Sequence, residues 1–300
     1  MLGSFQVAVL GTINRDTVFT SQGKKWEGFG GILYNLLGLS FLGEERIYLY
    51  PVCNLGEDCY EAVMGILSRV DNIRIDGIRR KGGKNNHATI VYKTSGEKEE
   101  TLEGRLPPLK YEEVKPYLGV DLLLVNFISG FDLGLETLKR IRREFEGIIY
   151  MDLHSLTLGV DPQGRRFLRP IPQGDEWIAQ ADILQVNQRE AGLLWDGPLE
   201  RTEELSKFGS RMLSLGPFCL LVTLGAQGTF LQESGHAFLL PSPSTTSFDD
   251  PTGCGDLFAS GFIWEYLRGG DTYKACQSGN QLASKEGLIG QFRLKKMRRS

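Results

Sequence analysis

The sequence lacks the features that mark several large classes of protein. It has no run of about 18 apolar residues, and its start, MLGSFQVAVLGTINRD, has neither the basic flank nor the long apolar stretch of a signal peptide. Its 37 acidic and 34 basic residues nearly balance, which argues against a broad nucleic-acid-binding surface. We therefore expect a cytoplasmic protein with no membrane span and no nucleic-acid partner.

Familiar cysteine and nucleotide motifs are also missing. The five scattered cysteines form neither a paired disulfide framework nor a C-x-x-C metal motif, which suits a reducing compartment. No G-x-G-x-x-G follows the first apolar segment, which argues against a nicotinamide-dependent oxidoreductase. The run Lys81-Gly82-Gly83-Lys84 resembles part of a phosphate-binding P-loop, but Asn85 follows where that loop needs Ser or Thr.

The chain does alternate short apolar runs with longer amphipathic stretches. Several apolar runs, such as LLLVN and CLLVT, are nearly continuous, as in strands covered on both faces. This alternation predicts an α/β fold with a mostly parallel sheet covered by helices. The predicted strands are Gln6–Leu10, Arg46–Val52, Asp121–Asn126, Ile148–Leu153, Asp182–Val186 and Phe218–Thr223. The predicted helices are Gly31–Leu42, Asp58–Arg69, Leu133–Phe145, Arg189–Leu194, Leu199–Leu215, Gly255–Arg268 and Asp271–Glu286.

Two stretches depart from this alternation. Thr17–Phe29 and Ile73–Thr101 contain strand-like segments with glycines and charges between them, which predicts an antiparallel flap. Arg165–Gln173 is predicted to be a loop. Because the 300 residues contain no internal repeat and no low-complexity linker, we expect one domain over residues 1–300, with the flap inserted at about 17–29 and 73–101.

The strongest chemical signal is FDDPTGCGD, at Phe248–Asp256, followed by an amphipathic stretch that ends at two glycines. Gly253, Cys254 and Gly255 are therefore expected at or just before a helix N-terminus. Free N–H groups and the helix dipole favour an anion there. The glycines also allow the backbone to approach a phosphate closely.

Asp256 then has two interpretations. A carboxylate in the first turn of a helix is commonly a favourable charge or a cap, with no chemical role. Transfer of a phosphoryl group to an alcohol, however, needs a group that takes the alcohol proton and an electropositive site for the developing charge. An Asp beside an anion-binding turn supplies both, so Asp256 is a candidate general base.

Two separated motifs resemble the paired signatures of the ribokinase-like sugar kinases, also called the PfkB family. The first is GGILYNLLGLSFLG and the second is DPTGCGD, and together they span essentially the whole chain in order. Pro251 and Cys254 depart from the commoner Thr and Ala without removing a required side chain, although Pro251 has no N–H to donate. The matching residues are Gly30, Gly31, Asn35, Leu42, Gly43, Asp250, Thr252, Gly253, Gly255 and Asp256.

The resemblance implies a ribokinase-like fold, which is a Rossmann-like three-layer α/β/α arrangement with a mostly parallel central sheet and a small β-sheet lid. It implies an ATP- and Mg²⁺-dependent kinase that phosphorylates a hydroxyl group on a sugar or nucleoside. Asp256 would be the catalytic base, and the turn of Gly253, Cys254 and Gly255 the anion hole. The flap would close as a lid that excludes water, and homodimers through the lid occur in part of the family.

The resemblance also implies a donor site. Asn187 and Glu190 would hold Mg²⁺ directly or through water, although N-x-x-E at a helix start is equally typical of a cap. Asp250 would be a ligand for a monovalent cation such as K⁺, near the segment Ala283–Gly287. The residues implied to bind ATP are Asn187, Thr223, Gly225, Gly228 and Thr252, although TLGAQG is also typical of a plain turn.

On the acceptor side, Asn14 and Asp16 follow the first predicted strand, and ligands of open parallel sheets lie beyond the carboxyl ends of strands. Asp16 is equally typical of a turn cap. The resemblance favours a role in binding the acceptor. The residues that it implies there are Asn14, Asp16, Gly30, Gly31 and Asn35. Ile32 stands where the family's ribokinases carry Lys, which argues against ribose itself.

Two alternatives remain open. A catalytically weak or inactive sugar- or nucleotide-binding protein of the same fold would keep the pocket and lose Asp256, Asn187 or Glu190, and all three are present. Kinases that phosphorylate hydroxymethyl groups on vitamins share the anion-hole motif but generally lack the first motif. The motifs do not identify the acceptor.

Overall fold

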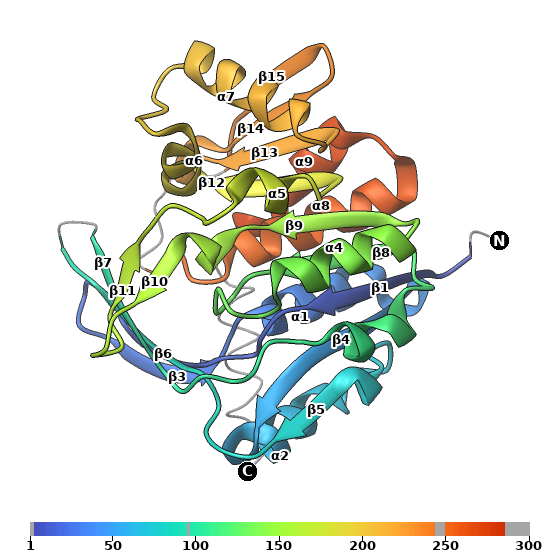
Figure 1. Ribbon diagram of the computed structural model, residues 1–300, viewed down its shortest axis with the longest axis vertical. Helices are drawn as coiled ribbons and strands as arrows, with labels where there is room; N and C mark the ends of the chain where they lie inside the picture. Colours follow the sequence, from blue (N-terminus) through green and yellow to red (C-terminus); the bar gives the residue numbers. More distant parts are fainter. Residues whose placement is uncertain (1–2, 95–96, 244–249, 286–300) are drawn as a thin grey trace.

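The computed structural model describes residues 3–94, 97–243 and 250–285. Its centre is a sheet of nine described strands in the order β15-β14-β13-β12-β9-β8-β1-β4-β5 (Figure 1). Strands from β5 to β13 in this order run parallel to their neighbours, whereas β14 and β15 are antiparallel. Their bounds are Phe5–Leu10 (β1), Ile47–Gly56 (β4), Ile78–Lys81 (β5), Leu122–Asn126 (β8), Ile148–Asp152 (β9), Ile183–Asn187 (β12), Cys219–Thr223 (β13), Thr229–Glu233 (β14) and His236–Leu240 (β15).

Helices cover both faces of this sheet (Figure 1). Side chains of β1 alternate between two cores, because successive residues of a strand point to opposite faces. Ala8 and Leu10 pack with helices α3 to α7, and Val7 and Val9 pack with α1, α2, α8 and α9. The helices are Ile32–Gly43 (α1), Glu57–Leu67 (α2), Tyr111–Val114 (α3), Leu135–Glu144 (α4), Gly174–Ile178 (α5), Gln188–Trp195 (α6), Thr202–Ser214 (α7), Cys254–Gly269 (α8) and Thr272–Ala283 (α9).

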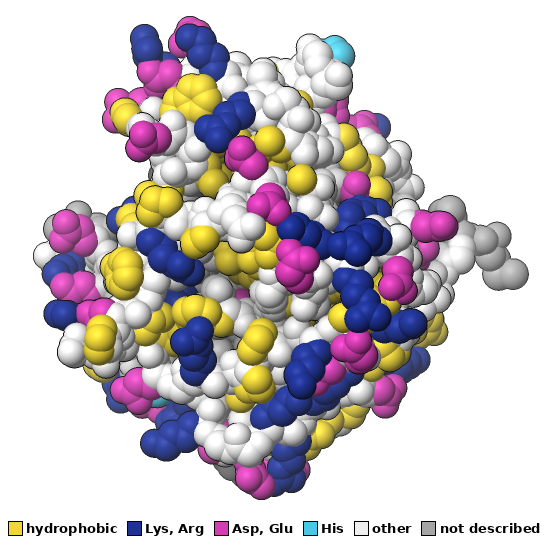
Figure 2. Space-filling view, in the orientation of Figure 1, with side chains coloured by type: hydrophobic (Ala, Val, Ile, Leu, Met, Phe, Trp, Pro, Cys, Tyr) yellow, Lys and Arg dark blue, Asp and Glu magenta, His cyan; other side chains and the backbone are white. Residues whose placement is uncertain are grey.

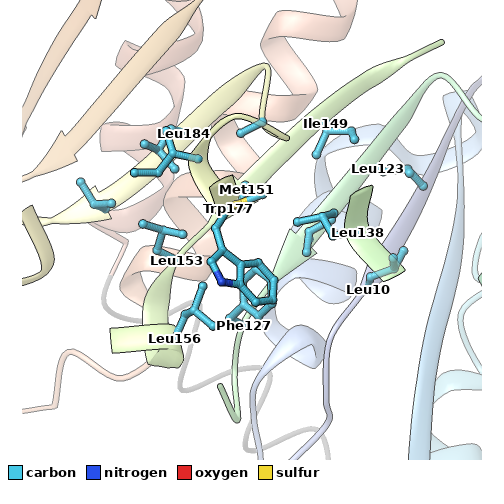
Figure 3. Close-up of a cluster of buried hydrophobic side chains, with 14 of the residues drawn as sticks. Leu10, Leu123, Phe127, Leu138, Ile149, Met151, Leu153, Leu156, Trp177 and Leu184 are labelled. Atoms are coloured by element: carbon cyan, nitrogen blue, oxygen red, sulfur yellow. The ribbon is translucent and has the colours of Figure 1, made fainter. Parts of the chain in front are cut away.

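One of these cores lies beside the loop that follows β8. Trp177 of α5 packs edge-on against Phe127, with ring centroids 5.3 Å apart, and leucines from β1, β8 and α4 surround the pair (Figure 3). Both rings are almost completely buried. Burial of large side chains fixes the loop directly after β8, which carries polar residues of the site described below.

The three-layer α/β/α fold predicted from the sequence is confirmed, and all six predicted strands and seven predicted helices are present. Element ends differ by a few residues. β4, for example, continues to Gly56 rather than ending at Val52. The last predicted helix was extended to Glu286, which lies outside the described residues, and α9 ends at Ala283. No helix in the described part of the chain is both long and apolar enough to cross a bilayer.

A second, four-stranded sheet packs at one end of the large sheet, in the order β3-β2-β6-β7 (Figure 1). The prediction of an antiparallel flap was only partly right, because β2 and β6 pair in parallel. These two strands come from separate segments of the chain, which enter the sheet from the same side. The four strands are Arg15–Phe19 (β2), Lys25–Phe29 (β3), His87–Tyr92 (β6) and Lys98–Glu103 (β7).

The predicted bounds of this small sheet also need correction. It begins at Arg15 rather than Thr17, and residues 73–86 do not belong to it. Ile78–Lys81 instead forms β5, which pairs with the end of β4 at the edge of the large sheet. Because β5 lies at the edge of the sheet, its side chains alternate between buried and more exposed positions. A lid strand has the same pattern.

A short antiparallel hairpin joins the two sheets. It consists of Leu158–Val160 (β10) and Arg166–Leu168 (β11), so the segment predicted as a loop begins with a strand. The hairpin contacts β7 through a hydrogen bond from the Leu102 N–H to the Gly164 carbonyl, at 2.8 Å. Figure 1 shows β10 and β11 beside β7, at the margin of the small sheet.

Candidate active site

The candidate site lies where the carboxyl ends of β1, β8, β9 and β12 meet the N-terminus of α8. Parallel strands end at the same edge of a sheet, so the polar residues that follow them come together there. Four polar residues illustrate this, because each stands at or a few residues after a strand end and is largely buried: Asn14, Asn126, Asp152 and Glu190.

Asp256 lies in the first turn of α8, three residues after Gly253, which precedes the helix in a left-handed conformation with a φ of 90°. A Cβ at Gly253 would lie 3.0 Å from the Tyr34 ring, so the position needs glycine for both its backbone conformation and its space. The first N–H groups of a helix have no acceptor within the helix. The Cys254 N–H is nevertheless bound by the Pro251 carbonyl at 3.0 Å, which leaves the next N–H groups of the turn to receive an anion.

The Asp256 carboxyl is held by a network of amide side chains. Asn126 donates from Nδ2 to Asp256 Oδ1 at 2.7 Å and to Asn35 Oδ1 at 3.0 Å. Asn35 in turn donates to the Asp256 backbone carbonyl at 2.9 Å. Asn126 Oδ1 is buried and has no partner among the described residues. Asn35, predicted to bind the acceptor, is therefore fully buried and joins α1 to α8 beside Asp256.

Burial raises the pKa of Asp256 to about 7, and the hydrogen bond from Asn126 opposes this shift. A carboxyl group with a pKa near 7 exists in both protonation states near neutral pH. It is therefore suited to accept a proton from an alcohol and to release it again.

Two further carboxyls lie close to Asp256. Burial raises the pKa of Asp152 well above its ordinary value, and repulsion from Glu190 and Asp256 adds to the shift. Burial also raises the pKa of Glu190 to about 7, against the opposing effects of Asn187 and Lys98. Repulsion of this kind between buried carboxyls disfavours their simultaneous ionisation and makes a nearby cation favourable.

Asn187 and Glu190 form the reciprocal cap of α6. The Asn187 N–H donates to Glu190 Oε2 at 2.8 Å, and the Glu190 N–H donates to Asn187 Oδ1 at 3.0 Å. The pair can therefore be both a helix cap and a set of Mg²⁺ ligands, because the cap also fixes the Glu190 carboxylate beside Asp152. Oxygen ligands of this kind, completed by water, suit Mg²⁺. Within the described residues, no cluster of three or more His, Cys, Asp or Glu forms a complete metal cage.

A cavity of about 260 Å³ opens on the other side of the α8 N-terminus. It is lined by the turn after β13, by the first residues of α8 and by the end of α9. Predicted nucleotide residues Thr223, Gly225 and Gly228 line it, whereas Asn187 and Thr252 do not. Gly228 has a φ of 104°, and a Cβ there would lie 2.0 Å from the Leu240 carbonyl oxygen. The glycine thus keeps this wall of the cavity open.

Residues predicted for the acceptor lie at the start of β2 and just before α1. Gly30 faces Asp16 so closely that a Cβ would lie 1.9 Å from an Asp16 carboxylate oxygen. Gly31 has a φ of 64° and caps α1, close to the Thr12 carbonyl. Asn14 Oδ1 is buried without a partner in the described part of the chain, and is available to a ligand. Asp16 belongs to β2 of the small sheet rather than to a loop.

The small sheet contacts the loop before α8. Trp26 of β3 donates from Nε1 to Asp250 Oδ2 at 2.7 Å, and the Tyr92 hydroxyl lies 2.9 Å from Thr252 Oγ1. Asp250 also accepts from the Thr252 N–H at 3.0 Å. Asp250 and Thr252 therefore connect the small sheet to α8, while their predicted roles toward K⁺ and ATP stay predictions. The segment Ala283–Gly287, predicted to lie near that cation, is described only up to residue 285.

Several residues at this site were missed by sequence reasoning. Asn126, Gln185, Trp26, Tyr92 and Lys98 were not singled out. Asn126 carried a usable signal, because it is a polar residue directly after the apolar run LLLV, as Asn187 is after its own strand. Gln185 donates to Asp152 at 2.8 Å and to the Gly255 carbonyl at 3.2 Å from inside a strand, where no pattern distinguishes it.

Comparisons with known proteins found similarity to kinases. Residues 159–285 match the model of the pfkB family carbohydrate kinases. An uncharacterized sugar kinase of Archaeoglobus fulgidus is 26% identical over 255 residues, covering 83% of this chain and 94% of that protein. A cytidine kinase of Thermococcus kodakarensis is 24% identical over 272 residues, covering 88% of this chain and 89% of that protein.

Solved structures show the same fold. The ribokinase of Thermotoga maritima superposes with a TM-score of 0.72 at 22% identity, over 93% of this chain and 92% of that one. A pyrophosphate-dependent kinase in the ribokinase family, complexed with a pyrophosphate analog and myo-inositol, gives a TM-score of 0.76 at 15% identity, over 93% and 94% of the two chains. Both sequence motifs, the family match over residues 159–285 and the shared fold thus make the chain similar to the ribokinase-like, or PfkB, carbohydrate kinases.

Proposed function

We propose that this protein transfers the terminal phosphoryl group of ATP to a hydroxyl group of a sugar or nucleoside, with Mg²⁺. The observation that carries the proposal is the position of Asp256. Its buried carboxyl, with a pKa raised by burial to about 7, lies at a helix N-terminus whose first residues line the cavity beside α9, and the buried polar residues Asn14 and Asp16 follow the neighbouring strand β1.

In this proposal Asn14 and Asp16 bind hydroxyl groups of the acceptor, and Gly30 and Gly31 allow the acceptor to approach α1. Asp256 takes the proton of the reacting hydroxyl as its oxygen bonds to the terminal phosphorus of ATP. The bond from that phosphorus to the bridging oxygen breaks, and ADP leaves with the electron pair. Asn35 and Asn126 act as positioning residues, because they hold the backbone and the carboxyl of Asp256.

The transferring phosphoryl group carries negative charge, which the protein must stabilise. The N–H groups in the first turn of α8 are placed for this, and the turn of Gly253 aims them away from the helix. Mg²⁺, when bound through Glu190, Asn187 and water, would neutralise charge on the phosphates. Lys98 of the small sheet stabilises the charged form of Glu190, and its ammonium group would add positive charge near the same phosphates.

The cavity beside α9 favours ATP over a donor without a base. Its volume is about 260 Å³, and its walls include the glycine turn after β13 and the apolar Phe258 of α8, a lining that suits an aromatic base better than a bare phosphate. The small sheet would act as the lid, since Trp26 and Tyr92 already tie it to the loop before α8.

The test is turnover by purified protein with Mg-ATP, and separately with Mg-pyrophosphate, against a panel of sugars and nucleosides. ADP release and ³¹P NMR of the product measure the reaction. A phosphorylated product formed from ATP with one acceptor class supports the proposal. A product formed only from pyrophosphate would reject ATP as the donor, and ATP binding without any product would favour the inactive binding protein.

A further inference from the structure

A buried arginine in the β10–β11 hairpin has hydrogen-bonding capacity that the protein does not use. The Arg166 side chain is 2% exposed. Its Nη1 donates to the Ser129 carbonyl at 3.0 Å. Its Nε and Nη2 are buried and have no hydrogen-bond partner within the described residues. A guanidinium group has five N–H donors, and donors left unpaired inside a protein are unfavourable unless a ligand completes them.

A second arginine lies close to the first. Arg169 Nε is also buried without a hydrogen-bond partner in the described part of the chain. Burial lowers the pKa of Arg166, Glu100 and Asp132 oppose this shift, and Arg169 adds to it. The Arg169 guanidinium is therefore within electrostatic reach of Arg166. Two adjacent cations with unused donors form a favourable position for an oxyanion.

The acidic residues nearby are already engaged. Glu100 accepts a contact from Lys98 at 2.9 Å and lies 3.5 Å from Arg166 Nε. Asp132 accepts hydrogen bonds from the Thr12 hydroxyl and from the Ser129 and Gly130 N–H groups. Figure 2 shows basic and acidic side chains next to one another along the margin where β7 lies in Figure 1.

His154 completes the cluster without adding charge near neutral pH. Burial lowers the pKa of His154 to about 4, and the nearby Lys98 and Arg166 contribute to the shift. The basic side chains of the cluster are Lys98, Arg166 and Arg169. The acidic side chains that face them are Glu100 and Asp132, and Glu190 faces Lys98.

The cluster is connected to the residues predicted to bind the acceptor. Ser129, which anchors Arg166, belongs to the loop that directly follows Asn126, and Asn126 donates to Asp256. The same loop binds Thr12, two residues before Asn14. The end of β8 and the loop that follows it therefore connect the Asp256 carboxyl, the segment that carries Asn14 and the arginine pair.

We propose that Arg166 and Arg169 bind an anionic group carried by the acceptor, so that the substrate is a phosphorylated or carboxylated sugar rather than a neutral one. This inference rests on the proposed function and specifies its acceptor. The anionic group would bind Arg166 Nη2 and Arg169 Nε, which have no hydrogen-bond partner among the described residues, and would compete with Glu100 for Arg166 Nε. The reacting hydroxyl, elsewhere on the same molecule, would face Asp256.

The experiment compares matched acceptors: neutral pentoses and hexoses, their phosphate monoesters and the corresponding sugar acids. Calorimetry without ATP measures their binding, and ADP release measures turnover. We expect the sugar phosphates or the sugar acids to bind. Comparison of these two sets shows which of the two anion types the protein prefers. Arg166→Gln should weaken the binding of the preferred acceptor about 10- to 100-fold, which is the effect expected when charge-assisted hydrogen bonds are lost.

Three controls keep this test decisive. Arg165→Gln removes an exposed arginine of the same hairpin, paired with Asp161 at 2.8 Å, and should leave acceptor binding unchanged. Arg166→Lys keeps the cation and should retain part of the affinity, which separates recognition from loss of folding. ATP affinity should stay unchanged in all three variants, because the anion hole at α8 remains intact.

Several outcomes would overturn the inference. They are tighter binding of neutral acceptors than of their anionic counterparts, no binding of any anionic acceptor, or equal acceptor affinity in wild type and Arg166→Gln. A neutral acceptor that is phosphorylated from ATP would overturn this inference while leaving the proposed kinase activity intact. Failure of phosphorylation with every acceptor, while anionic sugars still bind through Arg166, would reject the proposed function alone.

Discussion

Asn126 donates a hydrogen bond of 2.7 Å to Asp256, and this bond is the interaction that opposes the effect of burial on the Asp256 pKa. A proton acceptor works only when deprotonated. We therefore expect kcat/KM to rise with pH through a pKa of about 7 in the wild-type protein.

Asn126→Ala should move that rise to higher pH. Loss of the hydrogen bond stabilises the protonated carboxyl, so activity at pH 7 should fall on the order of tenfold and recover toward pH 9. The measurement is the pH profile of kcat/KM. Asn72→Ala removes another buried Asn, which donates to the Glu44 carbonyl far from the site, and should keep the wild-type profile. Identical profiles in all three proteins would contradict the proposed coupling.

The same buried carboxyl should lower stability as the pH rises. The folded protein raises the pKa of Asp256 from 3.8 to about 7, so it binds this proton more tightly than the unfolded chain does. The resulting stabilisation is complete below the unfolded pKa and is lost as pH rises through the folded pKa. Between pH 5 and pH 8 the loss should be roughly 2 to 3 kcal/mol, at 1.36 kcal/mol per pKa unit.

Asp256→Asn removes this titration and keeps the acceptor for Asn126. The free energy of unfolding, measured with urea at both pH values, should therefore fall between pH 5 and pH 8 in the wild type but not in the variant. The stability of the variant relative to wild type should thus be higher at pH 8 than at pH 5. Asp175→Asn, on the exposed surface of α5, is the matched control and should show no such change. A constant difference between Asp256→Asn and wild type at both pH values would argue against a raised pKa.

Lid closure gives a third prediction. Tyr92→Phe removes the hydroxyl that bonds Thr252, which should weaken the contact between the small sheet and the loop before α8. Water would then enter more often, so ADP release without phosphorylated acceptor should rise relative to product. Parallel ADP and product assays measure this ratio. Tyr50→Phe, which removes a hydroxyl bound to Gln6, should behave as wild type, and an unchanged ratio in Tyr92→Phe would contradict the lid role.

Sequence patterns were sufficient to predict most of the parallel strands of the large sheet and the helices that cover it. Strands such as LLLVN and CLLVT are covered on both faces, so their apolar runs are continuous and easy to recognise. Edge elements were harder. β5 has one buried residue in four, and its assignment to the lid failed because local alternation does not say which sheet a strand joins.

The sequence predicted the positions of those site residues that a local motif places. It did not predict the contacts that depend on tertiary packing. The position of Asp256 followed from glycines before an amphipathic helix. Asn35 had a motif, but its contact with Asp256 depends on how α1 packs against α8. The unpaired donors of Arg166 arise only when β11 packs against the loop after β8, so no sequence pattern marks them.

The most direct test of the central claim is the turnover of Asp256→Asn with the acceptor that the panel identifies. The account predicts a loss of about 100- to 10,000-fold in kcat, as expected when a general base is removed, with ATP affinity unchanged. Turnover at the wild-type rate in a correctly folded Asp256→Asn protein would show that Asp256 is not the base.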